Sequence, residues 1–386
     1  MHILAASLSG FRNLHDDAFE FSPRVNLVLG RNGEGKTNFL EALNYFALGR
    51  SHRGSRNEDL IGFHADALHV HLDVAGEDGA PFTCDYGIDR GGDRRFRLDG
   101  ELVTRRSDLV GKLVTVFFNP ESSQLVRGGP QFRRQYLDQG QAEIDPEYLR
   151  DLGSFQRALK QKAALLRDLR RGIADGRETR REVKAWNREL ARCAATVCLG
   201  RREQAGLLEP FAQLSHNNML DKDLKLEMIY RPRLESVRGF LASQPEIPGA
   251  KNDLAEEICR EIDYITELEI KRGRPLAGPQ FDDLEVRLDG VDLRGFGSQG
   301  ETRTAAIALI LARSDVLFQK RRIRPVLFLD DIFSELDRDR SHRLQDMASR
   351  EHQLFIATAR SDDVAGRLPG DPRTWSVESG RLRRQS

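Results

Sequence analysis

The chain has 386 residues, of which 39% are hydrophobic and 31% are charged. Because this length exceeds that of one minimal core, we expect two or three domains. The 60 Lys and Arg residues balance the 60 Asp and Glu residues, which excludes a uniformly basic nucleic-acid-binding protein but permits a local basic surface. The chain contains no apolar run long enough to span a membrane, no signal-peptide pattern and no C-x-x-C pair, so we expect a cytoplasmic protein with reduced thiols and no membrane partner.

The first 120 residues carry mainly strand patterns. Apolar and polar residues alternate over several short segments, and an Asp99-Gly100 turn lies between two of them. This region therefore predicts an antiparallel meander with tight turns, followed by one continuous apolar run that is typical of a buried strand. The predicted strands are residues 3–9, 68–74, 82–88, 95–98 and 101–103, with the buried strand at 114–118.

A phosphate-binding loop follows another strand near the N-terminus. The apolar residues 25–29 lead directly into a G-x-x-x-x-G-K-[ST] sequence, and helical spacing continues to Leu48. In such a loop, backbone N–H groups surround phosphate oxygens at a helix N-terminus, the lysine reaches the β- and γ-phosphates, and the threonine hydroxyl ligates Mg²⁺. The pattern predicts ATP binding at Gly30, Arg31, Asn32, Gly33, Glu34, Gly35, Lys36, Thr37 and Asn38.

The pattern becomes helical at Asp145-Pro146, a favourable start for a helix. Apolar residues then recur at heptad spacing up to Leu169, and a second stripe runs from Val183 to Val197, which predicts an antiparallel, coiled-coil-like hairpin. Residues 146–203 carry 15 Lys and Arg against 8 Asp and Glu. The cations form either an ordinary solvated helix face or a phosphate-contacting surface. The tip cations are Arg170, Arg171, Arg177, Arg180 and Arg181.

Three further elements follow the hairpin. Residues 224–231 suggest a strand, and residues 253–272 suggest one helix. The last six residues, 381–386, form a basic tail that we expect to be frayed.

The second half of an ATP site lies near the C-terminus. The apolar run from Pro325 to Leu329 ends in Asp330 and Asp331, which is a Walker B pattern. A buried strand of this kind delivers Asp330 to Mg²⁺, and Asp331 can orient or deprotonate the attacking water.

A signature-like sequence precedes this strand. Ser298 and Gly300 open an apolar helix, and alone they would indicate only a helix cap. With the Walker B strand after them, residues 334–337 as a D-loop and Thr358 in place of the usual switch histidine, the order of motifs resembles that of ABC-type ATPases. The resemblance implies a head-to-tail dimer in which Ser298 and Gly300 of one subunit complete the ATP site of the other.

Most of the chain separates the phosphate-binding loop from the Walker B strand, so we expect a split catalytic head. The predicted fold class is α/β: an ABC-type P-loop ATPase head with an inserted helical, coiled-coil-like arm. The expected domains are 1–140 (N-terminal part of the head), 141–220 (arm) and 221–386 (C-terminal part of the head).

A set of short motifs is distributed along nearly the whole chain: Gly10-Phe11-Arg12-Asn13-Leu14, the phosphate-binding loop with Asn32, Gly49-Arg50-Ser51-His52-Arg53, Gly128-Gly129-Pro130, Arg133-Arg134 before Tyr136-Leu137-Asp138, Gly278-Pro279 with Asp282-Asp283-Leu284, Gly297-Ser298-Gln299-Gly300, and Leu329 to Asp337. With these motifs the chain resembles the RecF family of bacterial recombination mediators. Three positions depart from the family pattern: Glu301, Gln280-Phe281 and Ala359-Arg360.

The resemblance implies an ATP-dependent DNA-binding dimer. RecF proteins act at single-strand gaps and ss/dsDNA junctions, and work with RecO and RecR to load the RecA recombinase. Lys36, Asp331 and Ser298 are then the expected catalytic residues, Thr37 and Asp330 the Mg²⁺ ligands, and Arg12 a further nucleotide contact. Because the side chain of Asp331 is one methylene shorter than that of glutamate, we expect slow hydrolysis.

Other functions stay open on the sequence. A transporter-type ABC ATPase subunit shares the signature and Walker B patterns, other SMC-like ATPases share the head, and a scaffold could bind ATP without hydrolysing it. His64, His69 and His71 lie near two aspartates, but their alternation places His69 and His71 on a solvent-facing strand surface rather than in a metal site.

Overall fold

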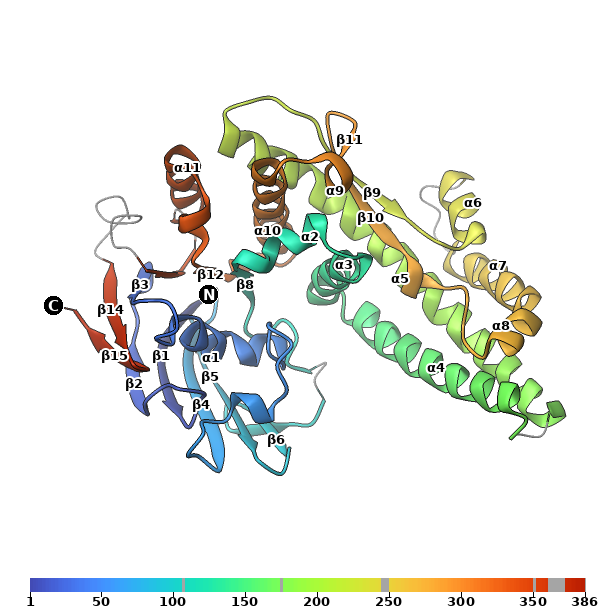
Figure 1. Ribbon diagram of the computed structural model, residues 1–386, viewed down its shortest axis with the longest axis horizontal. Helices are drawn as coiled ribbons and strands as arrows, with labels where there is room; N and C mark the ends of the chain where they lie inside the picture. The colour runs from blue at the N-terminus through green and yellow to red at the C-terminus, as the bar shows by residue number, and fades with distance from the viewer. Residues whose placement is uncertain (106–107, 174–175, 244–249, 350–351, 360–371, 386) are drawn as a thin grey trace. The chain divides into compact units, whose positions relative to one another are not determined.

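The computed structural model describes residues 1–105, 108–173, 176–243, 250–349, 352–359 and 372–385 (Figure 1). The chain divides into two compact units. The first unit comprises Met1–Ser123, Phe211–Leu224 and Gln299–Ser386, and the second comprises Gln124–Pro210 and Lys225–Ser298.

A mostly parallel six-stranded sheet forms the centre of the first unit, in the order β15-β14-β3-β13-β12-β8. The strands from β14 to β8 are parallel to their neighbours, and β15 is antiparallel. Every residue of β12 and β13 is buried, as continuous apolar runs predict. The strands are β3 (Val25–Leu29), β8 (Thr115–Phe118), β12 (Val326–Asp330), β13 (Leu354–Thr358), β14 (Arg373–Glu378) and β15 (Arg381–Arg384).

The second sheet of this unit is the predicted antiparallel meander, in the order β2-β1-β4-β5-β6-β7. Alternate residues of β4 and β5 are buried, so one face of the sheet packs on the core. The strands are β1 (His2–Ser9), β2 (Asp17–Glu20), β4 (Ala67–Ala75), β5 (Pro81–Asp89), β6 (Arg94–Leu98) and β7 (Glu101–Val103), which confirms the predicted strands.

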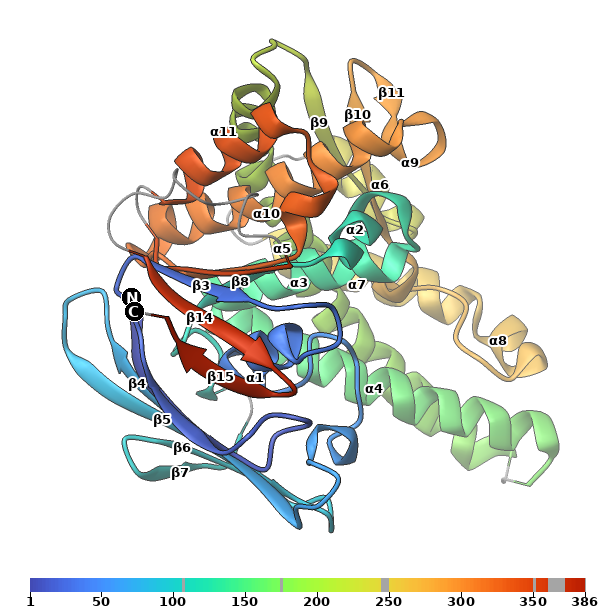
Figure 2. The ribbon, with the colours of Figure 1, turned by 60° about the vertical axis from the view of Figure 1, so that its left-hand side comes forward.

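Helix α1 (Lys36–Leu48) packs against both sheets of the first unit (Figure 2). The Tyr86 hydroxyl on β5 donates a hydrogen bond to the Ala42 carbonyl of α1 over 2.9 Å. Helices α10 (Gln299–Arg321) and α11 (Arg338–Ser349) cover the other face of the parallel sheet. The remaining short helices are η1 (Glu58–Leu60), η3 (Pro120–Ser123) and η5 (Ile332–Glu335).

The second unit is built on the predicted helical hairpin of α4 (Pro146–Arg171) and α5 (Gly176–Leu220). The last turns of α5, from Phe211, belong to the first unit. Asp145 caps α4, because its carboxylate accepts the Glu147 N–H over 2.8 Å. The other elements are α2 (Gln124–Arg127), α3 (Pro130–Ile144), α6 (Glu235–Ser243), α7 (Ala250–Tyr264), α8 (Thr266–Arg272), η4 (Pro279–Phe281), α9 (Leu293–Phe296) and the three-stranded sheet β11 (Val291–Asp292), β10 (Asp283–Leu288) and β9 (Leu226–Arg231).

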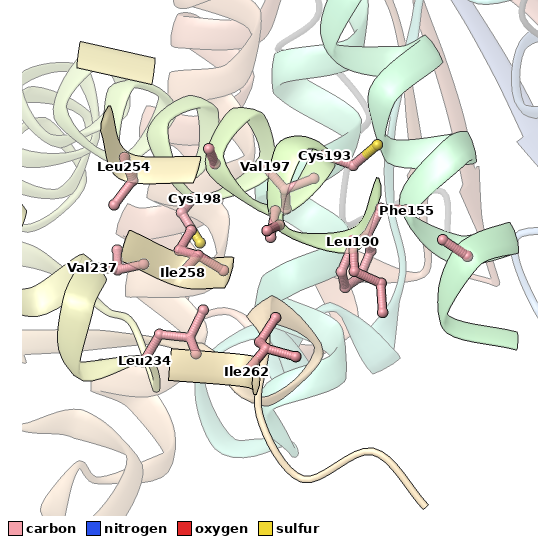
Figure 3. Close-up of a cluster of buried hydrophobic side chains, with 14 of the residues drawn as sticks. Phe155, Leu190, Cys193, Val197, Cys198, Leu234, Val237, Leu254, Ile258 and Ile262 are labelled. Atoms are coloured by element: carbon pink, nitrogen blue, oxygen red, sulfur yellow. The ribbon is translucent and has the colours of Figure 1, made fainter. Parts of the chain in front are cut away.

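The apolar stripe of the hairpin is shared with later elements (Figure 3). Phe155 and Leu190 of the hairpin belong to the same buried cluster as Val237 of α6 and Ile258 of α7. Ile270 of α8 belongs to a second buried cluster with Leu166 and Val183 of the hairpin, so residues 225–298 pack with the hairpin. The boundaries of the compact units thus differ from those of the expected domains, 1–140, 141–220 and 221–386. That these three ranges are independent domains stays a prediction.

Two local predictions were wrong. The single helix expected over 253–272 is interrupted at Ile265 (φ −92°, ψ 1°), where the Thr266 hydroxyl bonds back to the Ile262 carbonyl over 3.0 Å. The tail that we expected to be frayed forms β15, which pairs with β14 through a tight turn. Within the described ranges, none of the helices combines the length and apolar character needed to cross a bilayer.

Candidate nucleotide-binding site

The ends of three neighbouring parallel strands bring the predicted ATP-site residues to one edge of the sheet. Thr358 at the end of β13 pairs in register with Leu29 of β3, and Asp330 of β12 pairs with Ala357. The Gly30 N–H donates to the Thr358 carbonyl over 3.4 Å. The phosphate-binding loop and the Walker B carboxylates therefore meet where parallel strands deliver their carboxyl ends, which is where ligands bind in open α/β sheets.

The loop has the conformation that an anion site requires. Gly33 and Gly35 have φ angles of +85° and +118°, which side chains larger than glycine rarely adopt. Within the described residues, the N–H groups of Gly33, Gly35 and Lys36 donate to no protein acceptor. A Cβ added at Gly33 would meet open space, so the loop leaves room for a ligand beside these donors.

Lys36 is held inside the loop. Its side chain is only 4% exposed, and its ammonium group donates to the Gly30 carbonyl over 2.7 Å and the Arg31 carbonyl over 3.2 Å, with the Asn32 side-chain oxygen at 3.4 Å. These acceptors are neutral, so a phosphate oxygen would form a stronger, charge-assisted bond with the same cation. The geometry therefore fits the expected role of Lys36 toward phosphates.

The carboxylate of Asp330 has the properties of a metal ligand. Asp330 is 3% exposed, and burial raises its pKa to about 6, against the lowering effect of a hydrogen bond from Thr37. Its Oδ1 atom is buried and has no hydrogen-bond partner among the described residues. An orphaned carboxylate oxygen beside a threonine hydroxyl fits Mg²⁺, which takes oxygen ligands and usually one or two carboxylates.

Asp331 has an unusual backbone conformation. Its φ is +53°, and its N–H donates to the Ala357 carbonyl over 2.9 Å. Aspartate tolerates this left-handed region better than most residues, and such strained positions cluster at functional sites. The conformation turns the chain sharply after β12, so Asp331 leaves the sheet beside Asp330 as the sequence predicts.

Arg12 lies in a network of its own. Its Nε donates to the Glu41 carboxylate over 2.7 Å, and its other nitrogens donate to the Ser55 hydroxyl (2.9 Å) and the Asp59 carbonyl (3.3 Å). Glu41 is fully buried, so it needs this cation as a partner. The structure thus gives Arg12 a structural role, and its expected contact with the nucleotide stays a prediction.

Sequence reasoning missed Arg53 as a site residue. Its guanidinium donates to the Asn38 side chain over 3.2 Å, and its charge lowers the pKa of Asp330. Asn38 also donates to the Asn13 side chain over 2.8 Å, so it joins two loops rather than pointing only at a ligand. Residues 49–53 are among the segments that carried the family resemblance, and this resemblance could have indicated Arg53 as a site residue.

The signature-like residues are remote from the loop in the chain, and the boundary between the two units falls between Ser298 and Gly300. Ser298 ends the second unit and is exposed, whereas Gly300 lies in the first turn of α10 in the first unit. The Gly300 carbonyl accepts a hydrogen bond from Arg340 over 3.4 Å, and Arg340 pairs with Asp337 of the predicted D-loop over 3.1 Å. The role of Ser298 in a partner's site stays a prediction.

Several residues that carried the resemblance have structural roles in the second unit. Arg201 is buried and binds both oxygens of Asp138 (2.7 and 2.9 Å), and its third nitrogen lies 3.4 Å from Asp282. Arg133 makes a two-bond contact with Asp283 over 2.7 and 3.0 Å. These ion pairs join α3, α5 and β10. Removing one partner of such a buried pair would leave the other charge buried without compensation, which strongly destabilises a fold.

The three departures from the family pattern lie away from the phosphate-binding loop in the chain. Gln280 and Phe281 form part of η4, where the Gln280 side chain donates to the Ala277 carbonyl over 2.9 Å. Glu301 is exposed in the first turn of α10. Arg360 lies outside the described residues.

The histidines near β4 contact aspartates, and among the described residues no group of three or more His, Cys, Asp or Glu side chains is arranged to hold a metal ion. His71 lies between Asp85 (2.9 Å) and Asp73 (3.2 Å), and His69 lies 3.3 Å from Asp85. Hydrogen bonds and charges from the two aspartates raise the pKa of His71, although burial opposes this.

Comparison with known proteins places this geometry in a family. The family described as RecF/RecN/SMC N terminal domain matches residues 2–367. Relatives named "DNA replication and repair protein RecF" include one from Bifidobacterium adolescentis, which is 32% identical over 94% of this chain and 89% of its own length. Another from Heliobacterium modesticaldum is 31% identical over the full length of both chains.

The chain belongs to the RecF family. A solved structure titled as the recombination mediator protein RecF-ATPrS in the RecFOR pathway is 27% identical, with a TM-score of 0.87 over 100% of this chain and 98% of that chain. An Smc head bound to a domain of ScpA has a TM-score of 0.57 at 16% identity, which is a likeness of fold. These findings confirm the predicted fold class, an ABC-type ATPase head with an inserted helical arm.

Proposed function

We propose that this RecF-family chain is an ATP-dependent DNA-binding clamp of recombinational repair and replication restart. It acts in the cytoplasm at single-strand gaps and ss/dsDNA junctions, with RecO and RecR as partners in RecA loading. One observation carries the proposal: Lys36, Thr37 and the orphaned oxygen of Asp330 meet beside a phosphate-binding loop. Solved relatives titled as RecF with ATP and with ATPrS support it.

In this proposal the loop binds the triphosphate and the Walker B strand holds the metal. Lys36 and the N–H groups of Gly33 and Gly35 would contact phosphate oxygens. Thr37 and Asp330 would hold Mg²⁺, and the chemistry that this ion would supply is neutralisation of negative charge on the phosphates. Asp331 orients the attacking water and takes its proton. Hydrolysis is slow because a shorter carboxylate reaches the water less well.

We propose that the active form is a head-to-tail dimer, in which Ser298 and Gly300 of one subunit contact the γ-phosphate held by the other. The exposed position of Ser298 supports this, because a serine buried in its own chain could not serve a partner's site. Formation of a dimer with two ATP molecules between its subunits would then couple nucleotide binding to DNA binding.

Sedimentation of the wild type and of Ser298→Arg, with and without ATP and DNA, tests the dimer. We expect a dimer only with ATP, and its loss in Ser298→Arg because a long cation replaces a small hydroxyl at the phosphate. Ser243→Arg is the matched control, since Ser243 is an exposed serine of the same unit. An ATP-independent dimer, or an unaffected Ser298→Arg dimer, would contradict the proposal.

The proposed DNA contact is the tip of the helical arm. The sequence suggested Arg170 and Arg171 there, and the structure adds cations from α8: Arg170 donates to the Arg272 carbonyl over 3.0 Å, which holds the ends of α4 and α8 together. Arg171, Lys271 and Arg272 are exposed, and among the described residues no carboxylate pairs with them. Unpaired exposed cations fit a polyphosphate backbone.

Binding of duplex DNA over a salt series tests this surface. The triple variant Arg171→Gln, Lys271→Gln and Arg272→Gln should bind more weakly, and the slope of log K against log salt should fall by up to about 3, at about 0.9 per phosphate contact. Neutralising Arg94, Arg95 and Arg97, which are exposed on β6, makes the same change in charge as a control. Equal effects of the two triple variants would leave only a general charge effect and overturn the assignment.

A DNA-stimulated ATPase rate separates this function from that of a transporter-type subunit, which responds to a membrane partner. We expect duplex or gapped DNA to raise the rate, and Lys36→Ala to abolish it. A rate that does not respond to DNA would argue against the clamp.

A further inference from the structure

The hairpin at the C-terminus lies directly beside the phosphate-binding loop. Strand β14 is the parallel neighbour of β3, with Ser376 in register with Leu29 at the end of β3 (Figure 2). Parallel neighbours leave the sheet at the same edge, so the turn between β14 and β15, Ser379-Gly380, arrives next to the loop that follows β3. The two segments come from opposite ends of the chain.

Three backbone groups of this turn are bonded to the loop region. The Ser379 N–H donates to the Glu34 carboxylate, and the Gly380 N–H donates to the Glu34 carbonyl over 2.9 Å. The Gly380 carbonyl accepts the His15 N–H over 3.0 Å. Glu34 is one of the variable positions of the phosphate-binding loop, so both its side chain and its backbone are fixed by the turn.

The segment around Asn13 completes the contact. The Asn13 side chain donates to the Glu34 carbonyl over 3.4 Å and accepts from the Asn38 side chain over 2.8 Å. A Cβ added at Gly380 would lie 1.8 Å from the Asn13 carbonyl oxygen, which is backbone and cannot rotate away. The contact between the turn and the loop region therefore admits glycine alone at this position.

We infer that the Ser379-Gly380 turn is a positioning element of the phosphate-binding loop. It holds the Glu34 peptide in place, and with it the neighbouring N–H groups of Gly33 and Gly35 that face the ligand. The inference rests on the proposed binding of ATP and deepens it, because it makes the last strands of the chain part of the nucleotide site. Ser379 and Gly380 act through Glu34 and contact no phosphate.

The chain offers a matched control for this turn. Ser379-Gly380 has φ angles of +46° and +78°, and the Asp99-Gly100 turn of the same unit has +51° and +81°. Both are two-residue hairpin turns with positive φ at each position. A Cβ at Gly100 would meet nothing within 4 Å, so Gly100→Ala produces the same backbone strain without displacing a neighbour.

The experiment measures equilibrium binding of a fluorescent ATP analogue with Mg²⁺ to the full chain. We expect Gly380→Ala to weaken binding by about tenfold or more, as misplacing a binding group by about an ångström can do. Gly100→Ala should keep an affinity within about twofold of that of the wild type, although its backbone strain lowers the melting temperature. Equal affinities of Gly380→Ala and Gly100→Ala would overturn the inference.

A second pair of variants keeps the test decisive if Gly380→Ala folds poorly. Glu34→Ala removes the acceptor of the Ser379 N–H and should weaken nucleotide binding, whereas Glu34→Gln keeps an acceptor oxygen and should largely restore it. If Glu34→Gln binds as weakly as Glu34→Ala, the carboxylate acts on the nucleotide by its charge and the turn has no positioning role. A wild type that binds no ATP would instead contradict the proposed function itself.

Discussion

The buried ion pair between Lys162 of α4 and Glu269 of α8 offers a quantitative test of what holds the helical arm together. Their charged atoms lie 2.6 Å apart, and the side chains are 1% and 0% exposed. The other Glu269 oxygen accepts the Leu276 N–H over 2.8 Å. Burial lowers the pKa of Lys162, and the Glu269 charge opposes this, so each charge depends on the other.

Replacing one partner should cost far more than replacing both. Lys162→Met leaves the Glu269 carboxylate buried with a single N–H partner, for an expected loss of about 3–5 kcal/mol in the free energy of unfolding. Lys162→Met with Glu269→Met removes both charges and leaves only the Leu276 N–H without an acceptor, for a loss of about 1–2 kcal/mol. The double variant should therefore be more stable than the single variant by about 2–3 kcal/mol.

Urea unfolding followed by tryptophan fluorescence measures this difference. Trp186 on α5 and Trp375 on β14 are the two tryptophans of the chain, so a Trp375→Phe background makes the signal report on the second unit. Lys225→Met is the control, because the side chains of Lys225 and Glu227 are 70% and 25% exposed, so solvent screens their attraction and the pair should contribute little to stability. A Lys162→Met loss as small as the control's, or a double variant less stable than the single one, would refute the reasoning.

Three further predictions concern the first unit. Burial lowers the pKa of His352 to about 4. Between pH 6.5 and 4 this histidine is therefore protonated in the unfolded chain but neutral in the folded chain, so the free energy of unfolding decreases as the pH falls. This histidine accounts for about 3 kcal/mol of that loss, and His352→Gln should flatten the pH profile of thermal unfolding accordingly; an unchanged slope would show that its pKa is ordinary. Arg12→Ala should destabilise the fold by about 2–3 kcal/mol, because among the described residues it leaves the buried Glu41 with only the Ser51 hydroxyl, which donates to it over 2.5 Å. Adding Glu41→Gln should recover most of that stability, and an ATP affinity that stays low in the stable double variant would show that Arg12 also contacts the nucleotide. Asp331→Glu should raise the single-turnover rate of ATP hydrolysis by bringing a carboxylate closer to the water, and an unchanged rate would remove side-chain length as the cause of slow turnover.

Local sequence patterns were sufficient for the elements that surround the nucleotide site. The strand at 25–29, the glycine-rich loop and the helix after it follow from neighbouring residues, because a strand entering a G-x-x-x-x-G-K-T loop has few alternative conformations. The same holds for the Walker B strand and for the meander, since alternation with period two and tight turns are read within a few residues.

Predictions failed where an element depends on a partner remote in the chain. The last residues have no apolar run of their own, and they form β15 because β14 pairs with β3 and a Ser379-Gly380 turn brings the chain back. The arm's apolar stripe indicated a hairpin, but nothing in that stripe shows that α6 and α7 cover it. Arg12 and Glu41 are 29 residues apart, and only packing reveals that they form a pair.

The sequence by itself thus determined the chemistry of the site: which residues can bind phosphates, which carboxylates can hold a metal, and the order of motifs along an ATPase head. Tertiary structure alone decided how the loop is held, with the two ends of the chain bonded to each other at Glu34, and which cations gather at the end of the arm. The physical reason is that backbone propensity and phosphate chemistry act over a few residues, whereas hydrogen bonds and ion pairs between distant segments exist only after the sheet and the helices have brought those segments together.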